Sequence, residues 1–168
     1  MFYSVDLEKV IEGVERNLWS EFLDVNGSLP EYERRAGGYF CLSTVCYSNA
    51  PLRVMMVGDP PADKRAKYFE LCIEKANRLI ANGLGPQQHK LSWQSRNEAY
   101  DQWGGAVRWG DYVFSFSGLP ELADEALMLY LLYTAHGWGG VSSHPSDVDL
   151  ARLGSISGNP HFHLTPRV

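Results

Sequence analysis

The segment that most limits the fold is GGAVRWGDYVFSFSG, residues 104–118, in which large and small side chains alternate around a central glycine. Gly110 and Asp111 suit a two-residue type II′ turn, because glycine accepts the positive φ of the first turn position. Counting outward from this turn puts every second residue on the same face. One face then collects the large apolar side chains of Val107, Trp109, Tyr112, Phe114 and Phe116. The other face is small and polar and includes Ser115 and Ser117, so it either lines a cleft or lies under a helix.

The glycines of this segment do not match the spacing of ligand-binding loops. The chain contains neither G-x-G-x-x-G nor G-x-x-x-x-G-K, the spacings of dinucleotide-binding and phosphate-binding loops. Ser117 has Ser115 two places before it, where the nucleophile elbow of serine hydrolases requires glycine. We expect Gly105 to leave room for the ring of Phe116 across the hairpin. The segment is therefore interpreted as a β-hairpin and not as a phosphate-binding loop.

Three longer segments and one short segment have the pattern of helices. Residues 4–23 and 62–82 carry apolar side chains at i, i+3 and i+4 spacing, with charged residues between them. Residues 120–136 start with proline and acidic residues, which favour a helix N-terminus, and continue as ALMLYLLY. That run is apolar on all sides, so it needs a second covering surface from more of the chain or from a second subunit. A capping-box pattern at residues 95–98 predicts a short helix that ends near Trp103.

A second hairpin is predicted before the second helix. Residues 39–47 and 52–57 are rich in aromatic, β-branched and other apolar residues, and turn-forming residues separate them. The order helix, hairpin, helix, short helix, hairpin, helix predicts an α+β domain in which helices cover an antiparallel sheet. A chain of 168 residues is long enough for one domain with a core. Residues 138–168 follow the last predicted helix as a C-terminal extension of that single domain.

Charge and cysteine content exclude several classes of function. With 20 acidic and 15 basic residues the net charge is −5, which argues against binding to nucleic acid or to an anionic membrane. No run is long and apolar enough for a membrane span, and the N-terminus lacks the pattern of a secretory signal. Cys41, Cys46 and Cys72 are odd in number and form no C-x-x-C pair, so we expect free thiols and a cytoplasmic protein.

These segments together resemble the GlcG/HbpS family, the haem-degrading-protein-like domains also found at the C-terminus of PduO-type proteins. The resemblance covers about residues 5–136. It is carried by Lys75-Ala76 in the second helix, Gly104-Gly105 before the late hairpin, Ser117-Gly118 at its end, and Asp124-Glu125-Ala126 in the last helix. It implies a profilin-like fold, with a central antiparallel sheet flanked by helices. It also implies a homo-oligomer; some members of the family bind haem or a corrinoid as cofactor, and many have no settled role.

The chain departs from that family in the second strand of the late hairpin. Family members have a small, glycine-containing strand of the type GAIGVSG where this chain has YVFSFSG. Phe114 and Phe116 are therefore expected to fill space that relatives leave open. The matched residues are glycines and helix residues that serve the fold, so no haem ligand is carried over from the resemblance.

Two sets of residues are candidates for a binding site. The residues expected to line a ligand pocket are Ser115, Ser117, Trp103 and Trp109. The residues considered as ligands of a metal or haem iron are His144, His161 and His163, the last two of which would point the same way from an extended strand. The alternatives are that the tryptophans belong to the core or to an interface, and that the histidines are ordinary residues of a polar tail.

The sequence leaves three hypotheses of function open. The first is a domain that binds a small ligand, such as haem or another tetrapyrrole, without catalysis. The second is a structural or protein-interaction module that acts through an oligomer interface, which the apolar helix at 120–136 suggests. The third is an enzyme on the same scaffold, for which the sequence names no nucleophile and no pairing of acid and base.

Overall fold

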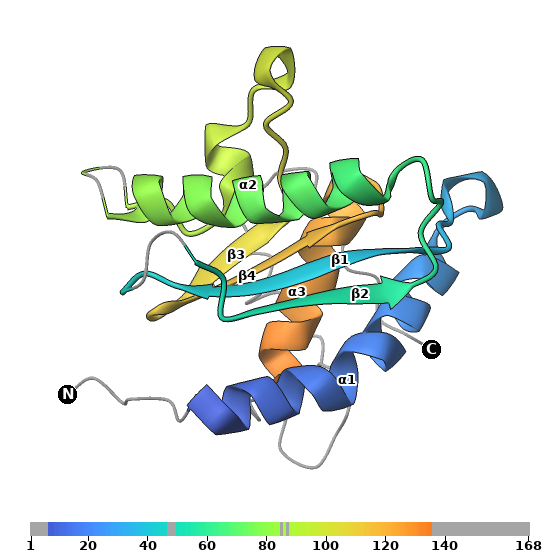
Figure 1. The fold of residues 1–168 in the computed structure, drawn as a ribbon, viewed down its shortest axis with the longest axis horizontal. Helices are drawn as coiled ribbons and strands as arrows, with labels where there is room; N and C mark the ends of the chain where they lie inside the picture. Colours follow the sequence, from blue (N-terminus) through green and yellow to red (C-terminus); the bar gives the residue numbers. More distant parts are fainter. Residues whose placement is uncertain (1–6, 47–49, 85, 87, 136–168) are drawn as a thin grey trace.

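A four-stranded antiparallel sheet lies between two layers of helices in the computed structural model, which describes residues 7–46, 50–84, 86 and 88–135 (Figure 1). The strands are β1 (Gly37–Thr44), β2 (Arg53–Gly58), β3 (Ala106–Trp109) and β4 (Tyr112–Ser117), and their order across the sheet is β2-β1-β4-β3. The long helices are α1 (Leu7–Ser28), α2 (Arg65–Gly83) and α3 (Glu121–Ala135). This architecture confirms the predicted α+β fold with a central antiparallel sheet flanked by helices.

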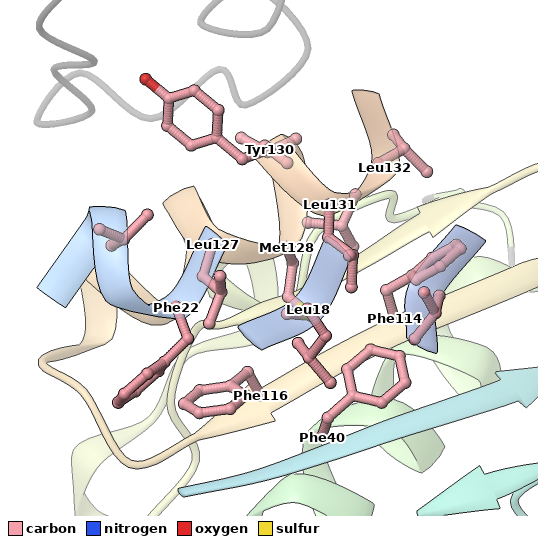
Figure 2. Close-up of a cluster of buried hydrophobic side chains, with 14 of the residues drawn as sticks. Leu18, Phe22, Phe40, Phe114, Phe116, Leu127, Met128, Tyr130, Leu131 and Leu132 are labelled. Carbon is pink, nitrogen blue, oxygen red and sulfur yellow. The ribbon is translucent and has the colours of Figure 1, made fainter. Parts of the chain in front are cut away.

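The two faces of the sheet are covered differently. Helix α2 packs on β1, β4 and β3 on one face, over a small cluster of buried residues that includes Cys41, Ala76 and Val113. Helices α1 and α3 pack against each other on the opposite face (Figure 1). Large rings from the sheet fill that second layer; Figure 2 shows Phe40, Phe114 and Phe116 beside leucine and methionine side chains of the two helices.

The apolar run in α3 is therefore covered by the same chain. Leu127, Met128, Leu131 and Leu132 belong to the cluster that also contains α1 and the aromatic face of the sheet, and all four are buried. The second covering surface that the sequence required comes at least in part from α1, whose buried stripe includes Leu18 and Phe22. An external subunit is not needed to explain the composition of α3.

The late hairpin has the predicted register. Trp109 pairs with Tyr112 and Val107 pairs with Phe114, so the large side chains share one face of the sheet. Gly110 takes a φ of +57°, the left-handed value that the expected turn requires.

The role predicted for Gly105 is wrong. A Cβ atom at Gly105 would lie 2.7 Å from Cβ of Asp124 and 3.0 Å from Nζ of Lys75, whereas Gly38 is the glycine that faces the Phe116 ring. Gly105 therefore makes room for a contact between helices and not for an aromatic ring.

Two local predictions differ from the structure. Helix α1 continues past 23 to Ser28, and the side chain of Asn26 near its end exchanges hydrogen bonds of 2.9 Å with the backbone of Arg35. The single short helix expected after 95 is replaced by two 3-10 turns, η2 (Ser92–Ser95) and η3 (Glu98–Tyr100). The side chain of Asn97 accepts a hydrogen bond at the start of η3, and the left-handed backbone at Asp101 ends η3. A further 3-10 turn, η1 (Glu31–Glu33), precedes β1.

Substitution of Gly105 by alanine tests the close approach of the helices. Gly105 has a φ of +110°, and its added Cβ would meet Asp124, so we expect a loss of about 3 kcal/mol or more in the free energy of unfolding, from backbone strain and overpacking together. Gly110→Ala is the matched control, because its φ is also positive but no atom lies within 4 Å; it should cost about 1–2 kcal/mol. Urea denaturation measures both, and equal losses would contradict the packing role of Gly105.

Candidate functional site

A buried ion pair joins the two helical layers. Lys75 of α2 and Asp124 of α3 have side chains only 2% and 3% exposed, and Lys75 Nζ lies 2.9 Å from Asp124 Oδ2. The same ammonium group donates to the carbonyl oxygen of Phe116 at 2.9 Å, at the end of β4. Asp124 Oδ1 accepts a hydrogen bond of 2.9 Å from the backbone amide of Leu119. The pair therefore ties α2, the end of β4 and the start of α3 together.

Burial dominates the electrostatics of this pair. The loss of hydration raises the pKa of Asp124 to about 6, although the ammonium of Lys75 and the amide of Leu119 both act in the opposite direction. Both groups have hydrogen-bond partners inside the protein and almost no contact with solvent. An acid and a base in contact can exchange protons in principle, but a substrate has no access to either one here.

A second set of polar groups lies between α2 and the sheet. Ser115 donates from Oγ to the carbonyl oxygen of Cys72 at 2.7 Å, and the Cys72 thiol donates to the carbonyl oxygen of Ser115 at 3.5 Å. Cys41 lies in the same buried cluster, with its Sγ 3.4 Å from Oγ of Ser43. The thiol of Cys72 lowers the pKa of Cys41, whereas burial raises the pKa of Cys72 well above its usual value. These groups satisfy one another in the interior.

The residues expected to line a ligand pocket do not come together. Ser115 and Ser117 are buried on the sheet face that α2 covers. Trp109 packs against the large cluster on the other face of the sheet. Trp103 lies outside the sheet, where its Nε1 donates to Asp101 at 2.6 Å and the Arg96 guanidinium stands over its ring at 5.1 Å. The small, polar face of the hairpin is thus a helix-packing surface.

The candidate metal ligands cannot be placed. His144, His161 and His163 lie outside the described residues. Within the described part of the chain, no group of three or more histidine, cysteine, aspartate or glutamate residues could hold a metal ion.

None of the helices described here is long and apolar enough to cross a bilayer.

Arg78 is a structural residue that the sequence did not single out. It is nearly buried, and its guanidinium group donates to Glu74 at 2.6 Å, to the carbonyl oxygen of Ser92 at 2.7 Å and to that of Trp103 at 2.5 Å. These bonds attach the segment that contains η2 and η3 to α2, beside which it projects (Figure 1). No local pattern distinguishes this arginine from a solvent-exposed one, because its partners lie 14 and 25 residues away.

The two edges of the sheet differ in their exposure. The outer edge of β3 is covered by residues 90–92: the amide of Arg108 donates to Lys90 O at 2.7 Å, and that of Ala106 donates to Ser92 Oγ at 2.9 Å. Leu91 also forms an isolated bridge with Val107. At the other edge, β2 pairs with β1 alone among the described strands. Edge strands with unpaired backbone groups readily accept another strand.

An exposed apolar patch adjoins this open edge. Because α2 packs on β1, β4 and β3, the same face of β2 is left open, and Met56 and Phe69 remain 50% and 41% exposed. Tyr39 joins them: its ring meets Phe69 edge-on at 5.6 Å, and its hydroxyl donates to Met56 Sδ at 3.6 Å. Val54 follows on the same face of β2, as its pairing with Cys41 shows. We call Tyr39, Val54, Met56 and Phe69 the β2-edge patch.

Comparison of the chain with protein-family models, with curated proteins and with solved structures found no match. The resemblance to the GlcG/HbpS family therefore stays a prediction. The candidate site is therefore identified from the geometry alone. It is the β2-edge patch.

Removal of one partner of the buried ion pair should be far more harmful than removal of both. Lys75→Met and Asp124→Asn each leave a buried polar or charged group without its partner, and each should cost about 3–5 kcal/mol in the free energy of unfolding. The double variant should cost less than the sum of the two by about 2 kcal/mol or more. Glu98→Gln, at the exposed pair with Arg96, is the control and should cost less than about 1 kcal/mol. Additive losses in urea denaturation would contradict the coupling.

The raised pKa of Asp124 predicts the direction of a pH effect. Its pKa is about 6 in the folded protein against the ordinary aspartate value of 3.8, so the folded state binds the proton more tightly. The resulting stabilisation is fully present below pH 3.8 and is lost as the pH rises to about 6. As the pH rises through that window, the free energy of unfolding of the wild type should fall relative to that of Asp124→Asn. A carboxyl carbon-13 titration of Asp124 with a midpoint below the ordinary aspartate pKa of 3.8 would contradict the prediction.

Proposed function

We propose that this domain acts without catalysis as an assembly module that binds a second copy of the chain through the β2-edge patch. The observation that carries the proposal is that one edge of the sheet is covered and the other is open among the described residues. Residues 90–92 cover the edge of β3, whereas no described strand pairs with the outer edge of β2, beside which Met56 and Phe69 are exposed. Large apolar side chains that cluster beside an open strand are typical of interaction surfaces.

The interior supports this choice over an enzyme. The side chains of Lys75 and Asp124 are both engaged in contacts that join the helices. Cys72 is buried and its pKa is raised, which makes its thiol a poor nucleophile. Cys41 is also fully buried, so a substrate does not reach its thiol even though the pKa of that thiol is lowered. None of these groups is accessible to a substrate in the fold described here.

Ligand binding has less support from the geometry than assembly. Ser115 and Ser117, which were expected to line a pocket for haem or another tetrapyrrole, lie under α2 and are buried. A self-associating module agrees with the homo-oligomer that the sequence predicts. The sequence suggested α3 as the oligomer interface, but α1 and the sheet cover the buried leucines of α3. The proposed interface therefore lies at β2.

Sedimentation velocity of the full chain tests the proposal. The wild type should sediment as an oligomer at concentrations from about 1 to about 100 µM, the range of a modest interface. Met56→Glu places a charge in the β2-edge patch and should weaken the association by about tenfold or more, since it opposes burial of that patch. A wild type that is monomeric over the whole range would overturn the proposal.

The matched control is Tyr100→Glu. Tyr100 is an aromatic residue of η3 that is 75% exposed and far along the chain from the β2-edge patch. Its substitution adds the same charge at another exposed position and should leave the association unchanged. An equal loss of association in both variants would show that the effect comes from net charge and not from the β2-edge patch. Circular dichroism checks that each variant is folded.

A further inference from the structure

We propose that two copies of the chain join by antiparallel pairing of their β2 strands about a two-fold axis at Met55, so that two four-stranded sheets become one continuous sheet. The inference rests on the proposed function, because it specifies how the β2-edge patch meets its counterpart. Four features of the described residues carry it: the direction of the backbone groups, the length of the extended strand, the distribution of charge, and the covered state of the opposite edge.

The backbone groups of β2 that no described strand takes up lie at alternate residues. The amide of Asp59 donates to Ala36 O at 3.0 Å, in continuation of the register in which Gly58 pairs with Gly37. Since neighbouring residues of an antiparallel strand bond to opposite sides, the odd-numbered residues of β2 bond to β1. The amide and carbonyl groups of Val54 and Met56 therefore point toward the open edge, where another strand can take them up.

The extended part of β2 sets the register. Gly58 has a φ of +67°, which interrupts the extended backbone, so the straight run is residues 53–57 with Met55 at its centre. Full overlap of this run with its copy places Val54 opposite Met56 of the second copy, and Met55 opposite itself. Val54 and Met56 are then the hydrogen-bonded pairs and Met55 the non-hydrogen-bonded pair, which agrees with the direction of their backbone groups.

Side chains in this arrangement are compatible on both faces. On the α2 side the β2-edge patch of one copy continues into that of the other through Val54 and Met56. On the opposite face the two Arg53 side chains stand at the two ends of the paired strands, four residues and about 13 Å apart, so like charges are not opposed. Arg53 is already paired with Glu15 of its own chain at 2.6 Å. The strand contains no lysine, proline or acid of the kind that protects edges.

The assembly closes after two copies. Because residues 90–92 cover the outer edge of β3, the only described edge open to pairing is that of β2. A two-fold pairing uses this edge in both partners and leaves no further one exposed. The proposal thus names a second copy of the chain, and a discrete dimer, as the occupant of the edge.

Cysteine cross-linking tests the register. In a Cys46→Ser background, which removes the exposed native thiol, Met55→Cys should form a covalent dimer when the full chain is treated with oxidised glutathione. The two thiols form one S–S bond and pass two electrons and two protons to the oxidant, which becomes two molecules of reduced glutathione. Paired residues on the axis have Cα atoms about 4.5 Å apart, within the span of a disulfide. Arg53→Cys is the matched control and should not cross-link, because about 13 Å separates the two copies.

Amide hydrogen exchange gives a second readout that needs no substitution at Met55. In the wild-type dimer the amides of Val54 and Met56 should exchange more slowly than in the Met56→Glu variant or at concentrations below dissociation. The amide of Met55, which bonds to β1, should change less.

The outcomes separate this inference from the proposed function. A covalent dimer with Met55→Cys and none with Arg53→Cys, together with protected amides at Val54 and Met56, supports the strand pairing. An oligomer by sedimentation that shows neither the Met55 cross-link nor the protection overturns the pairing while the assembly function stands. A wild type that stays monomeric overturns both.

Discussion

The buried ion pair between Lys75 and Asp124 is the contact on which the arrangement of the helices depends. It connects α2 on one face of the sheet with the first turn of α3, which packs on the other face. Neither charged group has access to water, so each is tolerated only beside its partner and the backbone groups of Phe116 and Leu119. The contact also requires a backbone without a side chain at the place where the two meet, and Gly105 supplies it.

Polar residues beneath α2 show why the sequence leaves the role of this strand face open. Ser115 and Ser117 occur on a small, polar strand face, which is as typical of a cleft as of a helix-packing surface. The structure distinguishes the two because Ser115 finds its hydrogen-bond partner in the carbonyl oxygen of Cys72, 43 residues away. A buried serine needs a hydrogen-bond partner, but its position in the sequence does not show whether that partner is a ligand or another part of the protein.

The edges of the sheet decide where the molecule can bind another chain. Residues 84–103 have no clear periodicity, yet the part at 90–92 covers β3, and Arg78 holds the neighbouring turns in place. At the opposite edge Phe69 of α2 contacts Tyr39 of β1 and stays 41% exposed, because α2 does not extend over β2. Closed and open edges are both built from ordinary residues, so neither is visible as a motif.

The sequence by itself determined the three long helices, the two hairpins and the register of the late hairpin, because these depend on local rules. A period of two around Gly110 places Val107 opposite Phe114, and helical spacing locates the three long helices. Only the tertiary structure decided the strand order β2-β1-β4-β3, the partner of Lys75 and the open edge at β2. The physical reason is the distance along the chain: Lys75 and Asp124 lie 49 residues apart, and which distant groups meet depends on how the layers pack.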